Sequence, residues 1–194
     1  LDALEVETAH VAGISMGGMI AQLLAARHGE RLRSLTSIMS SSGALGLPGP
    51  TPEAAAALMS LPDDPDDRES VLRHTVETEK VFASPGYPPG DDYLRAVAER
   101  AYDRCYCPGG VTRQMLAVMS GGGRTELLKT IRVPTLVIHG VDDPLIPVEA
   151  GMYTARRIPG AELRLIPGMG HDVAPGLIPT LVEAISEHTT AVEH

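Results

Sequence analysis

Lysine is scarce in this sequence, since Lys80 and Lys129 are the only two in 194 residues. Acidic residues outnumber Lys and Arg by 25 to 16, which leaves a formal net charge of −9 at pH 7. Proteins that bind nucleic acids present positive charge to the phosphate backbone. The composition therefore argues against nucleic acid as a partner of this chain.

Cysteine is also rare, and long apolar runs are missing. Cys105 and Cys107 are the only two cysteines, and their separation is poorly suited to a structural disulfide. We therefore expect a reducing, cytoplasmic location. No second ligand pair follows at a zinc-finger spacing, and we expect no metal site. Because no apolar run is long enough to cross a membrane and no signal-peptide pattern opens the chain, we expect no membrane association.

A serine stands where a short strand turns into a helix. Residues 10–14 are apolar and β-branched, as in a buried strand, and residues 19–28 are rich in strong helix formers. Between them lies Gly13-Ile14-Ser15-Met16-Gly17, in which the two flanking glycines remove Cβ atoms that would clash in a tight turn. This elbow exposes the Ser15 hydroxyl and leaves the Met16 N–H at a helix N-terminus, facing a developing oxyanion.

Partners that could activate Ser15 follow two later strands. The strand expected at 134–139 leads to Asp142 and Asp143, and the one expected at 162–166 leads to His171. A histidine takes the proton of a nucleophilic serine, and a carboxylate orients that histidine. Either aspartate could instead belong to a solvated turn, and His171 taken alone reads as a loop histidine.

Three sequence blocks in this order resemble the α/β-hydrolase family. They are Gly13-Ile14-Ser15-Met16-Gly17-Gly18, His139-Gly140-Val141-Asp142-Asp143-Pro144-Leu145-Ile146-Pro147 and Gly168-Met169-Gly170-His171. The order Ser, Asp, His is the one found in that family. The resemblance runs nearly end to end and is weaker between residues 44 and 126. Within the family the chain is most similar to esterases of the aclacinomycin methylesterase type, in its Ile166–His171 block and its helical insertion.

The resemblance implies roles for individual residues. Ser15 would be the nucleophile, His171 the general base and then acid, and Asp143 the triad carboxylate with Asp142 as the fallback. The backbone N–H of Met16 would be one oxyanion donor. No cofactor is implied. The family's second oxyanion donor comes from a loop before the elbow, and we expect it to be absent from this chain.

The beginning of the chain departs from the family pattern. Only fourteen residues precede Ser15, and residues 1–7 look like the tail of a helix. The family has further strands before the elbow, so we expect this chain to hold only the C-terminal strands of the parallel sheet. It would then be a truncated piece, with a missing N-terminal segment or a homo-oligomer covering the open sheet edge.

The expected fold is α/β, with strands at 9–14, 34–39, 134–139 and 162–166. Helices at about 17–28, 148–157 and 174–189 alternate with these strands, as parallel βαβ units require. Residues 1–43 and 127–194 would form the hydrolase core, and residues 44–126 a helical cap insertion. Helices of the insertion are expected at 52–60, 68–83, 91–104 and 111–119.

The predicted activity is hydrolysis of a carboxylic ester of a small or medium apolar substrate through an acyl-enzyme. Five methionines could line an adaptable apolar pocket, although core packing is the expected role of most of them (Met16, Met19, Met59, Met115 and Met119). Two alternatives belong to other classes: a piece that is catalytically silent alone, and a hydrolase-fold protein that only binds a ligand. The same triad also serves lactonases, C–C hydrolases, aminopeptidases and cofactor-free haloperoxidase-like proteins.

Overall fold

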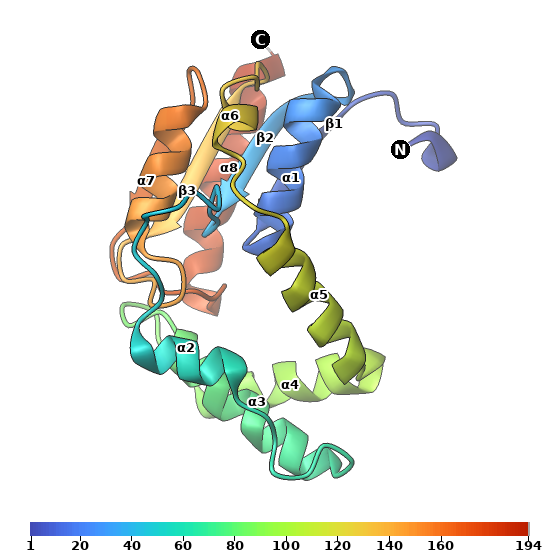
Figure 1. The fold of residues 1–194 in the computed structure, drawn as a ribbon, viewed down its shortest axis with the longest axis vertical. Helices are drawn as coiled ribbons and strands as arrows, with labels where there is room; N and C mark the ends of the chain where they lie inside the picture. The colour runs from blue at the N-terminus through green and yellow to red at the C-terminus, as the bar shows by residue number, and fades with distance from the viewer. Residues whose placement is uncertain (194) are drawn as a thin grey trace.

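A parallel sheet forms the centre of the computed structural model, which describes residues 1–193. Its strands lie side by side in chain order (Figure 1): β1 (Ala9–Ile14), β2 (Leu32–Ile38), β3 (Thr135–Gly140) and β4 (Glu162–Ile166). Each neighbouring pair is parallel, so all four strands end at the same edge of the sheet. The predicted α/β architecture is confirmed.

Helices cover both faces of this sheet. α1 (Met16–Arg27) packs against β1 and β2, and α7 (Val148–Arg157) packs against β3 and β4. The short α6 (Thr125–Leu128) touches both helices, and α8 (Ile178–Glu193) lies on the opposite face. With helices on both sides, every residue of β3 is buried, which explains the apolar run 136–138 at its centre.

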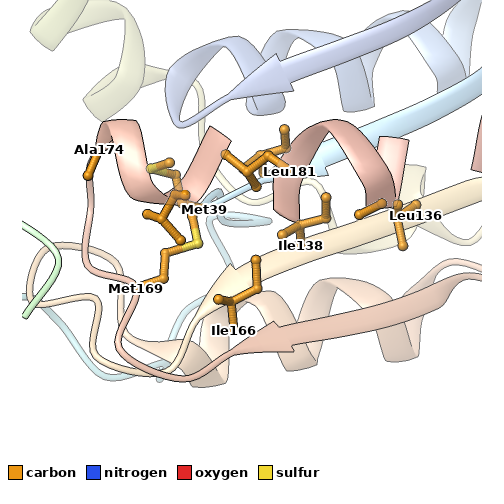
Figure 2. Packing of buried hydrophobic residues seen from close by; sticks show 10 residues of the cluster. Met39, Leu136, Ile138, Ile166, Met169, Ala174 and Leu181 are labelled. Atoms are coloured by element: carbon orange, nitrogen blue, oxygen red, sulfur yellow. The ribbon is translucent and has the colours of Figure 1, made fainter. Parts of the chain in front are cut away.

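The larger core cluster lies between the sheet and α8, as Figure 2 shows. Leu136 and Ile138 are two residues apart on β3 and therefore point to the same face. They meet Ile166 from β4 and Leu181 from α8. Met169, which is fully buried, packs there as well and anchors the chain just before His171.

Four helices between β2 and α6 leave the sheet altogether. They are α2 (Pro52–Met59), α3 (Arg68–Phe82), α4 (Asp91–Cys105) and α5 (Pro108–Ser120), and the first three lie beyond the carboxyl ends of the strands. Thr51 caps α2 by accepting from Ala54 N at 3.1 Å, and its own N–H donates to Pro144 O at 2.9 Å. None of the described residues of α5 is buried. Their role as a cap stays a prediction.

Several predicted boundaries were wrong. β2 begins at Leu32 and not at 34, and α5 begins at Pro108, which occupies the first helical position where proline is well tolerated. α8 is preceded by a 3₁₀ helix (Pro175–Leu177) and ends at Glu193. The expected helix tail at residues 1–7 is a single 3₁₀ turn (Asp2–Leu4). α6 and a 3₁₀ helix at Gly29–Arg31 were not predicted.

Within residues 1–193, no helix combines the length and apolarity that a membrane crossing requires.

Candidate active site

Ser15 occupies a sharply bent position between β1 and α1. Its backbone has φ 52° and ψ −117°, a region that costs a non-glycine residue about 1–3 kcal/mol. Two neighbours hold it there: Ser15 N donates to Ile38 O at 2.9 Å, and Ser40 Oγ donates to Ser15 O at 2.8 Å. The sheet therefore holds Ser15, which is half-buried, in the turn between β1 and α1 that the elbow motif predicted.

The glycines of the elbow act differently from the prediction. A Cβ on Gly13 would overlap the carbonyl of Gly17, so that glycine is required. A Cβ on Gly17 would meet nothing within 4 Å, and the prediction that its side chain would clash was wrong. Gly18 is the second constrained position, because its Cβ would lie 2.6 Å from Cβ of Ser40. The crowding at Gly13 thus arises within the elbow, whereas the crowding at Gly18 comes from the loop after β2, which is distant in sequence.

His171 lies between Ser15 and Asp143. Its Nε2 is 3.0 Å from Ser15 Oγ, and its Nδ1 is 2.8 Å from Asp143 Oδ2. An ionised carboxylate only accepts hydrogen bonds, so Nδ1–H donates to Asp143 and Nε2 is left to accept from the serine hydroxyl. The three residues predicted as a triad are brought together, with the histidine in the tautomer that base catalysis needs.

The two adjacent aspartates have different partners. Asp143 is buried, and its second oxygen, Oδ1, accepts from Leu145 N at 2.9 Å and from Ile146 N at 2.8 Å. Asp142, the fallback, does not contact His171; its Oδ2 accepts from Gly168 N at 2.7 Å. The structure thus assigns the imidazole contact to Asp143 and a loop contact to Asp142.

A second histidine lies behind Asp143. His139 is fully buried, its Nε2–H donates to Ile146 O at 2.7 Å, and the same nitrogen is 3.6 Å from Asp143 Oδ2. Burial lowers the pKa of His139, which favours the neutral ring. The sequence predicted a structural histidine with its hydrogen bonds satisfied, but Nδ1 has no partner among the described residues.

Met16 opens α1, and the N–H groups of a helix's first turn have no intrahelical acceptor. Its backbone N–H therefore has no acceptor within the helix, and its role as an oxyanion donor stays a prediction. Phe82 also lies at the site and was not predicted: its ring meets the His171 ring edge-on at a centroid distance of 6.4 Å. Phe82 ends α3, and only the folded arrangement of the insertion brings it to this edge of the sheet.

A hollow of about 380 Å³ opens beside Ser15. Its walls are apolar except for Ser15 and Gln114, and no charged side chain lines it (Ser15, Met16, Met19, Pro50, Leu58, Val111, Gln114, Met115, Val118, Leu145 and Ile146). Three of the five methionines singled out in the sequence line it, whereas Met59 and Met119 are exposed. None of the five belongs to the buried core, so the expected packing role of most of them was wrong.

Known proteins are similar to this chain in sequence and in fold. The α/β hydrolase family model matches residues 1–181. Rhodomycin D methylesterase DauP of Streptomyces sp. (strain C5) is 30% identical over 98% of this chain, and DnrP of Streptomyces peucetius, with the same activity, is 29% identical. The solved 2-hydroxy-6-oxo-6-phenylhexa-2,4-dienoate hydrolase of Rhodococcus sp. strain RHA1 superposes with a TM-score of 0.73 over 96% of the chain at 22% identity, which shows a shared fold.

The chain spans 70% of the length of these methylesterases and 66% of the solved hydrolase. The relatives include esterases and other hydrolases, and this similarity supports the classification of the chain as a carboxylic ester hydrolase. With a family model that covers nearly the whole sequence, the chain belongs to the α/β hydrolase family.

Proposed function

We propose that this chain is a serine hydrolase that cleaves a carboxylic ester through Ser15, His171 and Asp143. The observation that carries the proposal is the hydrogen-bonded series from Ser15 Oγ to His171 Nε2 and from His171 Nδ1 to Asp143 Oδ2, at 3.0 and 2.8 Å. Three segments distant in sequence meet to form it, at the carboxyl ends of β1, β3 and β4.

The reaction follows from these positions. Ser15 Oγ attacks the ester carbonyl carbon while His171 Nε2 takes its proton, and Asp143 stabilises the imidazolium that forms. The Met16 N–H donates to the oxyanion of the tetrahedral intermediate. His171 then protonates the departing alcohol, leaving an acyl-enzyme on Ser15. A water molecule, deprotonated by His171, attacks this ester and releases the acid.

The hollow beside Ser15 supports an apolar substrate. Because no charged side chain lines it, an uncharged acyl or alcohol group gains from entering, whereas a carboxylate would be desolvated without a partner. We infer that residues 44–126 act as a cap, since α2 and α5 supply Leu58, Val111 and Met115 to its wall. The methylesterase relatives make a methyl ester of an apolar acid the first substrate to try.

Hydrolysis of a C–C bond is a less favoured alternative. One relative, 28% identical, is a 2-hydroxy-6-oxononadienedioate/2-hydroxy-6-oxononatrienedioate hydrolase, whose named substrates carry two carboxylates. The uncharged hollow of this chain favours a neutral ester over such a dianion.

The test is the intact mass of the protein before and after treatment with a fluorophosphonate. We expect a single adduct on the wild type and none on Ser15→Ala, together with loss of ester hydrolysis in that variant. A wild-type protein without an adduct would refute the proposal and favour a chain that is silent alone. Tight binding of an ester without an adduct or product would favour a ligand-binding protein instead.

A further inference from the structure

The loop that carries His171 is held by a segment of the helical insertion. Residues 167–172, called here the histidine loop, follow β4 and contain neither helix nor strand. Residues 82–86, called here the docking segment, comprise the last residue of α3 and the turn after it. A loop without secondary structure takes its position from the contacts that other segments make with it.

Backbone hydrogen bonds join the two segments at both ends. His171 N donates to Phe82 O at 2.8 Å, and Gly86 N donates to Gly168 O at 2.9 Å. The approach is so close that a Cβ on Gly170 would lie 2.6 Å from Phe82 O. The glycines of the histidine loop are therefore explained by the insertion packed against them.

Ser84 forms the centre of this contact and is fully buried. Its Oγ accepts from Gly170 N at 2.8 Å, and its hydroxyl donates to Asp172 Oδ1. The same carboxylate oxygen also accepts from Ser84 N at 3.2 Å. One serine thus binds the residues on either side of His171, through all of its polar atoms except the carbonyl.

We propose that Ser84 and Asp172 are a positioning pair that fixes the backbone of His171 and, through it, the contact between His171 Nε2 and Ser15 Oγ. The inference rests on the proposed role of His171 as general base. Neither residue contacts Ser15 or Asp143 by a hydrogen bond, so neither takes part in the proton transfer itself.

The expected effect of Ser84→Ala follows from the geometry. The variant leaves Gly170 N–H buried without an acceptor and removes the hydroxyl donor of Asp172 Oδ1, which keeps only the backbone N–H of residue 84, so the loop has reason to move. His171 Nε2 lies 3.0 Å from Ser15 Oγ, and a misplacement of about 1 Å costs about 10²-fold in rate. We expect kcat to fall by about 10–100-fold with KM nearly unchanged, because neither Ser84 nor Asp172 lines the hollow.

Asp172 offers a graded comparison on the other side of the pair. Asp172→Asn keeps an oxygen that can accept from Ser84 and should retain most of the activity. Asp172→Ala removes the acceptor of the Ser84 hydroxyl and N–H but leaves Gly170 N bonded to Ser84 Oγ, so it should lose activity in the same direction but less than Ser84→Ala. Because Ser84→Ala already removes both hydrogen bonds of the Ser84 hydroxyl, the double variant should be little slower than Ser84→Ala alone.

The experiment combines steady-state hydrolysis of a p-nitrophenyl ester with hydrogen–deuterium exchange of the histidine loop. Ser70→Ala is the matched control, because Ser70 is another buried serine of the insertion, whose Oγ accepts from Asp64 N at 2.9 Å, remote from His171. We expect faster exchange at Gly170 and His171 in Ser84→Ala and Asp172→Ala, and no change there in Ser70→Ala.

Two results would overturn the proposal. Unchanged exchange in the histidine loop of Ser84→Ala would show that the pair does not hold it, and this readout does not depend on enzymatic activity. Faster exchange with wild-type kcat would show that the loop position does not govern the reaction. If Ser84→Ala fails to fold, the two Asp172 variants give the same decision. A wild-type protein without Ser15-dependent hydrolysis would refute the proposed function separately, because exchange still reports on the contact.

Discussion

Replacing Asp143 by asparagine tests the electrostatic half of the proposed triad without changing its shape. Oδ1 of Asp143 accepts from two backbone N–H groups, those of Leu145 and Ile146. In the variant the amide oxygen must take that place, because an NH₂ group there would face two donors. The NH₂ group then faces His171 Nδ1 in place of Oδ2, which is 2.8 Å away. His171 is driven to the tautomer whose Nε2 carries the proton and cannot accept the one from Ser15.

The loss of kcat expected in Asp143→Asn is large. In a serine protease triad the same change lowers kcat by about 10⁴-fold, which corresponds to about 5 kcal/mol of transition-state stabilisation. We expect a loss of about 10³–10⁴-fold in Asp143→Asn, measured as kcat on a p-nitrophenyl ester and as the rate of fluorophosphonate labelling of Ser15. Circular dichroism checks that the variant is folded.

Asp142→Asn is the matched control, with the same chemical change one residue away. Asp142 accepts from Gly168 N and not from His171, and an asparagine oxygen can keep that bond. We expect this variant to lose only a small part of the activity. If Asp143→Asn kept a tenth of the wild-type kcat, or if Asp142→Asn lost as much as Asp143→Asn, the assignment of the triad carboxylate would be wrong.

Three further predictions concern stability. Gly13→Ala should prevent or severely weaken folding, because its Cβ would overlap a carbonyl. Gly17→Ala, in open space within α1, should raise the free energy of unfolding by up to about 1 kcal/mol. Equal effects of the two variants in urea titrations would contradict this. Burial, reinforced by the charge of Asp172, raises the pKa of Glu79. Ionisation of Glu79 therefore opposes folding as the pH rises above 4.5, the ordinary pKa of a glutamate. Glu79→Gln should have a higher Tm than the wild type at pH 7.5, and the difference in Tm should disappear toward pH 4. The pKa of His139 is lower in the folded protein than in the unfolded chain, so the unfolded chain takes up the proton at higher pH. The free energy of unfolding should therefore fall as the pH drops through about 6.5. In His139→Gln the free energy of unfolding should depend less steeply on pH in this range.

Much of the fold could be predicted from local patterns. The bounds of β1, β4 and α7 match the prediction, because short apolar runs ended by turn residues leave little choice. The errors gather where a proline or a tertiary contact sets the boundary. α5 begins three residues early at Pro108, through two glycines that disfavour a helix on local grounds. α6 is only four residues long and contributes the fully buried Leu128 to the core, so packing, more than propensity, accounts for it.

The candidate site was predictable to the extent that its chemistry is written in short motifs. Ser15 and His171 follow strands that the sequence reveals, and the parallel sheet brings those strand ends to one edge. The choice between Asp142 and Asp143 depended on resemblance alone, because both follow the same strand. In the fold their hydrogen bonds distinguish them, since Asp142 binds Gly168 N and Asp143 binds His171 Nδ1. Phe82 and Ser84 could not be predicted, since they lie 89 and 87 residues before His171, at the end of α3 and in the turn after it.

The insertion contributes to the candidate site in two ways, and these ways are physically linked. Its helices α2 and α5 supply part of the wall of the hollow, while the turn after α3 holds the histidine loop through Ser84. α2 packs on α3, and Thr51 N, just before α2, binds Pro144 O in the loop of Asp143. A change in α2 that reshapes the hollow is therefore transmitted to α3, which positions His171, and to the loop that carries Asp143. Substitutions that alter substrate preference through α2 should accordingly change kcat as well as KM, whereas substitutions in α5, none of whose described residues is buried, should act mainly on KM.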